Sequence, residues 1–434
     1  MILVAITADD RQRLGGAARA PPVIGLGVDT RKDALLLEAS NVARCVSKGK
    51  SEPFECRNHV RVLQPLRDGQ RLYVCGTNAH SPKDWVVYLN LTHLPRHEYV
   101  PGVGLGVAKC PYDPADNSTA VWVTEGNPGG LPALYAGTNA EFTKADPVIF
   151  RNDLFDLRTG QKKFNFKRTL KYDSKWLDKT NFVGSFDVGE YVFFFFRETA
   201  VEFMNCGKAV YSRVARVCKQ DNGGKHILNQ NWATYLKARL NCSIPGEFPF
   251  YFDEIQSVYQ MPGDTSRFYA AFTTGASDGL VGSAICSYTM EDIQEAFAGR
   301  FKEQATSSSA WLPVLRARVP EPRPGVCVNN TEALPDNVLN FIRLFPFTGT
   351  GLISSSSQSR GLTLVLGTRR VRILIGSCVL IDVALQNSTH RRVAARRPTC
   401  GRVARAPRPV AMFPRSRRLR LIACNFLWAE REAA

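Results

Sequence analysis

The sequence DVGEYVFFFF, residues 187–196, joins a Gly-containing turn to a continuous run of β-branched and aromatic residues. A short apolar run bounded by a turn is typical of a buried strand, because these residues suit the packed surface of a sheet. Comparable runs recur along the chain, at 71–75, 85–89, 120–123, 268–272 and 283–288. Clusters rich in Gly and Asn separate them, at 76–78, 126–130 and 275–279. Many short strands divided in this way predict an all-β sandwich, barrel or propeller.

The β-rich body runs from about residue 32 to residue 345, and a propeller is the easiest single-domain fit for that length. Three segments read as helices inserted on this scaffold. Residues 231–240 are apolar at 232, 235, 236 and 240, which predicts a helical face. Residues 291–297 begin with acids and are followed by Gly299, which suits a helix end, and residues 336–343 form the third segment.

Charge is distributed unevenly along the 434 residues, which carry a net charge of +17 and are 44% hydrophobic. That hydrophobic content excludes wholesale disorder. Residues 346–434 hold 16 Arg, no Lys and 3 acidic residues, whereas residues 1–345 hold 40 basic and 36 acidic residues. The body is therefore near neutral, and we expect no basic groove for nucleic acid on it. We interpret the Arg-rich tail as disordered or aberrantly translated, and a nucleic-acid module is the least favoured reading.

Catalytic and membrane signals are weak. The six His form no HExxH motif, no Cys-x-x-Cys pair is present for zinc, and Gly102-x-Gly104-x-Gly106 has the wrong spacing for a dinucleotide loop. We therefore expect that the protein is not an enzyme and that it has no catalytic residue, no bound metal and no cofactor. The apolar start is too short for a visible signal peptide, and no segment is long enough to span a bilayer.

The number of cysteines and the N-glycosylation sequons favour a secreted glycoprotein. The chain has twelve Cys, many for a cytosolic protein of this size. Nine of them lie in the body, so at least one is left without a partner inside it. The body also contains four N-x-[ST] sequons, at Asn90, Asn117, Asn241 and Asn329.

Several longer motifs follow one another through the body. They are CVSKGKSEPFEC (45–56), YVCGTNA (73–79), CPYDP (110–114), YAGTNAEF (135–142), FFFFRE (193–198), RVARVCKQDNGG (213–224), LKARLNC (236–242), VPEPRPGVC (319–327) and LPDNVLNF (334–341). In this order they resemble the semaphorin domain, and most nearly the secreted class-2 semaphorins of invertebrates. The resemblance covers about residues 33–345 and implies a seven-bladed β-propeller.

The resemblance also implies a disulfide framework. Three pairs carry over directly: Cys45 with Cys56, Cys218 with Cys327, and Cys242 with Cys286. Asp84 stands where many relatives have a second Cys, so Cys75 needs another partner, and Cys110 is the candidate. Cys206 is then left over, either as a buried free thiol or as an interchain disulfide, since this family dimerises.

The implied function is that of an extracellular ligand, which binds plexin receptors and steers growing axons and migrating cells, mostly by repulsion. The receptor contact would map here to Lys175, Trp176, Asp178, Lys179, Lys219, Asp221, Lys225 and His226. The alternative is that these are ordinary solvated loops with Trp176 in the core. Other interpretations are a fragment of a plexin-like receptor ectodomain, a propeller enzyme, and a non-functional truncated gene product.

The chain departs from the family at both ends. Residues 1–32 do not match and are expected to be disordered, and the likeness stops near Leu344, about two blades before the family's domain ends. A propeller closes by pairing its last blade with the start of the chain. We therefore expect a partial propeller at 33–345, followed by the tail at 346–434, with unpaired strands and compromised receptor binding.

Overall fold

The computed structural model describes residues 35–348, except 67, 157, 245, 262, 276–281 and 307, together with strands at 3–4, 353–354, 371–374 and 380–383. The chain divides into units 1–393 and 394–434, and every described residue belongs to the first. The segments 1–32 and 346–434 and the turn at 275–279 lie largely outside the described residues.

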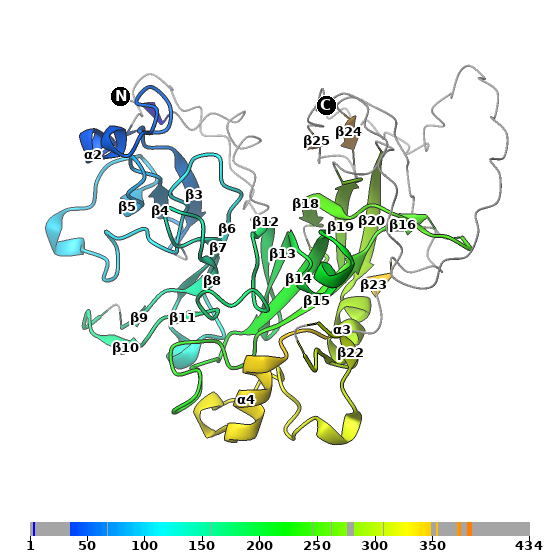
Figure 1. The fold of residues 1–434 in the computed structure, drawn as a ribbon. Coiled ribbons are helices and arrows are strands. Elements are labelled where there is room, and N and C mark those ends of the chain that lie inside the picture. The colour runs from blue at the N-terminus through cyan, green and yellow to red at the C-terminus, as the bar shows by residue number, and fades with distance from the viewer. Residues whose placement is uncertain are drawn as a thin grey trace, which may run out of the picture. The chain divides into compact units, whose positions relative to one another are not determined.

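Most of the regular secondary structure in the described chain is β-sheet (Figure 1), and four sheets have three or more strands. The first sheet contains β3 (Val60–Pro65), β4 (Arg71–Gly76) and β5 (Lys83–Tyr88). The second contains β6 (Thr119–Val123), β7 (Ala133–Asn139), β8 (Pro147–Arg151) and β11 (Lys167–Arg168). The third contains β12 (Asn181–Val188), β13 (Tyr191–Thr199), β14 (Val210–Cys218), β15 (Leu236–Asn241) and, parallel to β15, β23 (Ile353–Ser354). The fourth contains β18 (Glu254–Gln260), β19 (Arg267–Thr273) and β20 (Ser283–Thr289).

Two-stranded ribbons and short helices complete the described chain. The ribbons are β1 (Leu3–Val4) with β2 (Leu35–Leu36), β9 (Leu154–Phe155) with β10 (Lys162–Phe164), β16 (Ser243–Ile244) with β17 (Phe250–Tyr251), β21 (Lys302–Glu303) with β22 (Leu312–Pro313), and β24 (Val371–Leu374) with β25 (Leu380–Val383). The α-helices are α2 (Val42–Ser47), α3 (Met290–Ala298) and α4 (Asp336–Leu344). The 3-10 turns are η1 (Arg96–Glu98), η2 (Pro128–Gly130), η3 (Val201–Cys206), η4 (Arg316–Arg318) and η5 (Thr331–Ala333).

Successive sheets meet through their first strands. β3 contacts β6, β6 contacts β12, and β12 contacts β18. Neighbouring blades of a propeller pack in the same way, and the predicted all-β class is confirmed. The sheets do not close into a ring within the part of the chain that the structure describes.

The core centres on the run that predicted the fold. Phe193–Phe196 are all buried on β13, which lies between β12 and β14 in its sheet. Phe195 packs against Phe268 of the fourth sheet with ring centroids 5.1 Å apart, and Phe186 approaches the same ring at 5.2 Å. Because both faces of β13 are covered, its apolar residues are continuous rather than alternating.

Two of the three predicted helices are confirmed. α3 begins after a capping box, in which the Thr289 hydroxyl accepts from the Asp292 N–H and the Asp292 carboxylate accepts from the Thr289 N–H. α4 covers the predicted 336–343 and extends to Leu344.

The predicted helix at 231–240 is wrong, because this segment enters β15 at Leu236. Residues 232–238 are buried without interruption, so the apolar spacing belongs to a strand covered on both faces and not to an amphipathic helix.

Replacement of Phe195 by Ala is expected to lower the free energy of unfolding by about 3–5 kcal/mol, because it leaves a cavity between two sheets. Phe248→Ala is the matched control, since Phe248 is 88% exposed and should change stability by less than about 0.5 kcal/mol. Chemical denaturation of both variants measures the difference. Equal losses would contradict the placement of Phe195 in the core.

Candidate functional site

Four disulfides cross-link the described body. They join Cys45 to Cys56, Cys75 to Cys110, Cys218 to Cys327 and Cys242 to Cys286, with Cα atoms 5.7, 6.0, 5.3 and 5.8 Å apart. The Cys218–Cys327 bond closes a loop of 109 residues and ties β14 to the segment before α4. Loops of that length lose the most chain entropy on closure, so this bond restricts the unfolded state most.

Asp84, which stands where many relatives have a Cys, forms a buried polar site. It is 1% exposed and accepts hydrogen bonds from the Tyr73 hydroxyl at 2.9 Å and from the Gly104 N–H at 2.7 Å. Lys109 Nζ lies 2.6 Å from its carboxylate. These partners satisfy a charge that would otherwise be costly to bury.

Cys206 lies at the end of η3, is only half-buried, and is disulfide-bonded in the structure. The expected alternative of a buried free thiol is therefore wrong. One sulfur forms only one disulfide, so the predicted bond between two chains would require exchange of the bond present here.

The sequons occupy different environments. Asn90, Asn117 and Asn329 are exposed. The Asn90 carboxamide oxygen accepts from the N–H and hydroxyl of Thr92, which shapes an open turn. Asn241, in contrast, ends β15 with its side-chain oxygen buried and is followed by the bonded Cys242. Glycosylation of Asn241 stays a prediction.

The residues predicted to contact a receptor lie on two loops, and three of them are buried. Trp176 has no exposed surface, stacks on Tyr235 with ring centroids 4.7 Å apart, and donates from Nε1 to the Arg343 carbonyl. Its prediction as an exposed contact is wrong, because a large apolar ring beside this sheet gains more from packing than from solvent.

Asp221 and Lys219 are also unsuitable as exposed contacts. Asp221 is fully buried and accepts hydrogen bonds from the Ala233 N–H, and from both the N–H and the hydroxyl of Thr234. It therefore shapes its own loop. Lys219 is 8% exposed and pairs with Asp187 at 2.5 Å.

The other predicted contacts reach solvent. Lys179, Lys225 and His226 are exposed, and Lys175 and Asp178 are half-buried. The two loops meet at α4, which contacts both of them. The Arg343 carbonyl accepts the Trp176 indole N–H, and Leu339 packs so closely on Gly224 that an added Cβ would lie 2.4 Å from it. We call the exposed part of this region the α4 surface; it comprises Lys171, Tyr172, Lys175, Asp178, Lys179, Lys225, His226 and Arg343.

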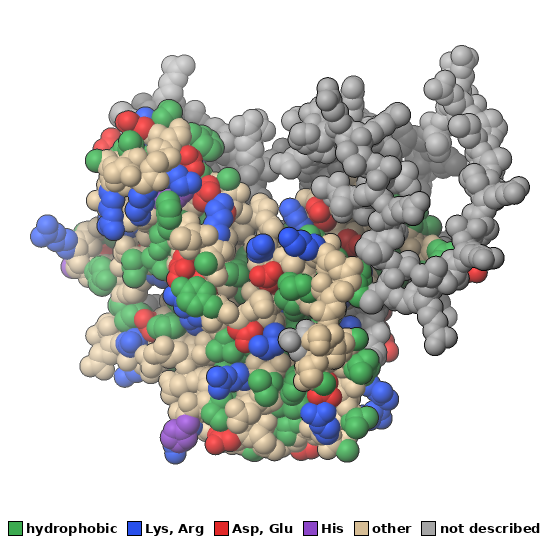
Figure 2. Space-filling view, viewed as in Figure 1, with side chains coloured by type: hydrophobic (Ala, Val, Ile, Leu, Met, Phe, Trp, Pro, Cys, Tyr) green, Lys and Arg blue, Asp and Glu red, His purple; other side chains and the backbone are tan. Residues whose placement is uncertain are grey.

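The α4 surface includes a hollow of about 440 Å³ that sequence reasoning missed. Its lining includes Lys171, Tyr172, Lys175 and Arg343. Arg343 is 168 residues beyond Lys175 in the chain, so only the fold brings them together. The face drawn in Figure 2 mixes basic, acidic and apolar side chains and shows no continuous basic stripe. Mixed charge around a hollow suits specific protein recognition.

A buried charge cluster supports the loop that carries Trp176. Glu198 Oε1 lies 2.7 Å from Arg213 Nε and 2.6 Å from Lys237 Nζ, and its second oxygen accepts from the Asp178 N–H. Lys237 also donates to the Trp176 carbonyl at 2.7 Å. Burial lowers the pKa of Lys237 to about 8, against the attraction of Glu198. The cluster thus fixes the loop to three strands.

Glu202 completes the cluster through Arg213 Nη2, at 2.6 Å. Burial alone would raise the pKa of Glu202, but the charge and hydrogen bond of Arg213 outweigh it and lower the pKa to about 2. The same acids hold the pKa of Arg213 above its ordinary value, against desolvation.

Within the described ranges, no three His, Cys, Asp or Glu side chains gather in a way that could hold a metal ion. Of the helices described, none combines the length and the apolar character needed to cross a membrane.

Comparison with known proteins places this geometry in a family. A family model for the Sema domain matches residues 255–360. Semaphorin-2A of Schistocerca gregaria is 74% identical over 318 residues, which are 73% of this chain and 45% of that protein. The solved structure of Drosophila Semaphorin 2a matches with a TM-score of 0.76 and 63% identity, and covers 80% of this chain and 57% of that one. A structure of Drosophila Plexin A in complex with Semaphorin 1b matches with a TM-score of 0.64 and 39% identity, over 76% and 60%.

These matches define a Sema-domain protein. The chain belongs to the semaphorin family, and the resemblance found in its motifs is confirmed. It spans less than half the length of the Schistocerca relative.

Trp176→Ala is expected to lower the free energy of unfolding by about 3–5 kcal/mol, because the indole is fully buried against Tyr235. Lys179→Ala, three residues away and exposed, should leave stability within about 0.5 kcal/mol. Thermal and denaturant unfolding of both variants test this. Unchanged stability of the Trp176→Ala protein would contradict the burial of the indole.

Stability is expected to fall as the pH drops from 4.5 towards 2, because Glu202 ionises more readily in the folded state than in the unfolded one. The pair with Arg213 contributes fully above pH 4.5, and its loss amounts to about 3 kcal/mol. Glu202→Gln should remove this part of the acid dependence, whereas Glu295→Gln, on the exposed face of α3, should keep it. Urea unfolding at several pH values measures the slopes, and parallel profiles for all three proteins would count against the assignment.

Proposed function

We propose that this chain is an extracellular semaphorin-type ligand, which binds a plexin ectodomain and steers, mostly by repelling, growing axons and migrating cells. The observation that carries the proposal is the likeness to Drosophila Semaphorin 2a, at 63% identity and a TM-score of 0.76. The match to a structure in which Semaphorin 1b is bound to Plexin A supports the choice of receptor.

In this proposal the four sheets are blades of a seven-bladed propeller, which residues 33–345 form in part. The contacts between the first strands of successive sheets support this arrangement. Apart from β23, which joins the third sheet, the residues before and after it are proposed to lie outside the propeller. The full-length ligand is proposed to be a homodimer.

Secretion is supported by the covalent chemistry of the body. Four disulfides persist in an oxidising compartment, and three sequons present exposed Asn side chains that an oligosaccharide could reach. The ligand acts by binding alone in this proposal, with no catalytic step and no cofactor.

The α4 surface is the proposed receptor contact. Its exposed residues include Lys179, Lys225 and His226, on two loops that a buried cluster and α4 hold in place. Fixed loops reduce the entropy that binding must overcome, and their charges guide the encounter.

Charge reversal of both Lys179 and Lys225 to Glu is expected to slow association with a plexin ectodomain by about tenfold at low salt, because rim charges act mainly on the association rate. Lys163→Glu is the control, an exposed lysine on β10 outside the α4 surface. Surface plasmon resonance against a panel of plexin ectodomains measures both rates. Identical association rates for the two charge-reversed proteins would exclude the α4 surface as the contact.

A further inference from the structure

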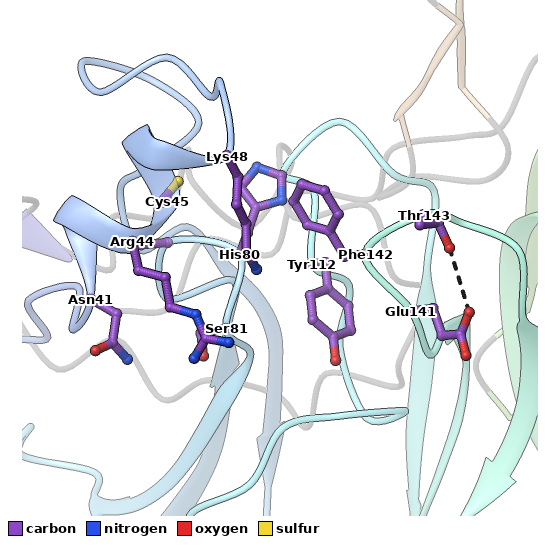
Figure 3. Close-up of a pocket in the computed structure, with 11 residues that line it drawn as sticks. Asn41, Arg44, Cys45, Lys48, His80, Ser81, Tyr112, Glu141, Phe142 and Thr143 are labelled. Atoms are coloured by element: carbon purple, nitrogen blue, oxygen red, sulfur yellow. Dashed lines mark hydrogen bonds between the residues drawn. The ribbon is translucent and has the colours of Figure 1, made fainter.

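A second hollow, of about 410 Å³, lies beside α2 and borders the α4 surface only through Glu141, which pairs with Lys171 (Figure 3). Its walls come from α2, from the turn after β4 and from the segment after β7. The lining is largely polar and cationic, and includes Arg44, Lys48, His80, Ser81, Tyr112 and Phe142.

Two cations, Arg44 on α2 and Lys48 directly after it, border this hollow without a compensating acid. Arg44 and Lys48 are exposed, and among the described residues neither has a carboxylate at ion-pair distance. Lys48 Nζ instead lies 4.7 Å from the centroid of the Phe142 ring. The carboxylate on the opposite wall, Glu141, is already paired with Lys171 at 2.7 Å. The hollow therefore keeps an excess of positive charge.

His80 supplies an unsatisfied buried group to the same hollow. It is 3% exposed, yet neither ring nitrogen has a hydrogen-bond partner. Its ring meets Phe142 edge-on, with centroids 5.3 Å apart, and Figure 3 shows the two rings side by side. An imidazole always carries at least one N–H, and leaving a buried donor unpaired is costly.

The backbone that presents His80 is itself constrained. Asn78, Ala79 and His80 all have positive φ, at 44°, 54° and 54°. Non-glycine residues seldom adopt this conformation, and such strain persists only where the surroundings impose it. The Asn78 side chain provides that support by donating to Ser40 Oγ and to the Ser81 carbonyl.

We propose that this hollow binds one tetrahedral oxyanion, the sulfate or phosphate ester group of a ligand. Arg44 and Lys48 supply the charge, and the His80 imidazole donates its unpaired N–H to an anion oxygen. The donors come from separate walls, and an oxyanion with several terminal oxygens can meet them together. Burial and the charge of Lys50 lower the pKa of His80, and even a neutral imidazole carries one N–H that can donate to an anion oxygen.

Calorimetric titration of the full chain with inorganic sulfate and inorganic phosphate, at constant ionic strength in chloride, tests the site. Saturable binding of either anion is expected, and Lys48→Gln or Arg44→Gln should weaken it by about tenfold through loss of a charge-assisted contact. Lys163→Gln, an exposed lysine on β10, should bind like the parent chain. Absence of saturable binding, or equal binding by all variants, overturns the proposal.

Two further measurements identify the chemical source of the anion and test whether it binds beside His80. Glucose 6-sulfate and glucose 6-phosphate, with glucose as the uncharged control, distinguish a sulfated sugar from a phosphate ester as the source of the anion. NMR of the His80 ring should show its resonances shift on addition of the anion that binds, and not with chloride. Binding that leaves these resonances unmoved would place the anion elsewhere and overturn the proposal.

Discussion

The Glu198 carboxylate is the constraint on which the candidate surface depends. It has no exposed side-chain surface, and it holds Arg213 of β14, Lys237 of β15 and the N–H of Asp178 at once. A buried charge tolerates no missing partner, because removal of one side of such a pair costs about 3–5 kcal/mol. The three strands and the Trp176 loop are therefore fixed relative to one another by the same group.

This constraint extends to the surface through backbone contacts. The Trp176 carbonyl accepts from Lys237 and from the Tyr235 hydroxyl, and the indole N–H reaches Arg343 of α4. The exposed loop residues consequently start from a rigid base, as binding loops on a fixed scaffold commonly do.

The sequence predicted the strands well because short runs of β-branched and aromatic residues between turns favour buried strands. Phe193–Phe196 can all be buried together only in a strand that is covered on both faces, and β13 forms where the run predicts it. The segment 231–240 failed, because a strand buried on both faces and a helix with a broad apolar face share the same spacing over ten residues. Burial of Lys237 was invisible for a related reason, since its partner Glu198 is 39 residues away.

The candidate surface was predicted only in outline. The motif resemblance located the two loops, but it could not sort exposed residues such as Lys179 from buried ones such as Trp176, because both lie in one short polar segment. Arg343 carried no signal, since its role follows from where α4 packs. His80 was equally silent in the sequence, because a lone histidine becomes informative only when its burial and its missing partners are known. Pairing and packing across the chain, rather than local pattern, determine which side chains are left to bind.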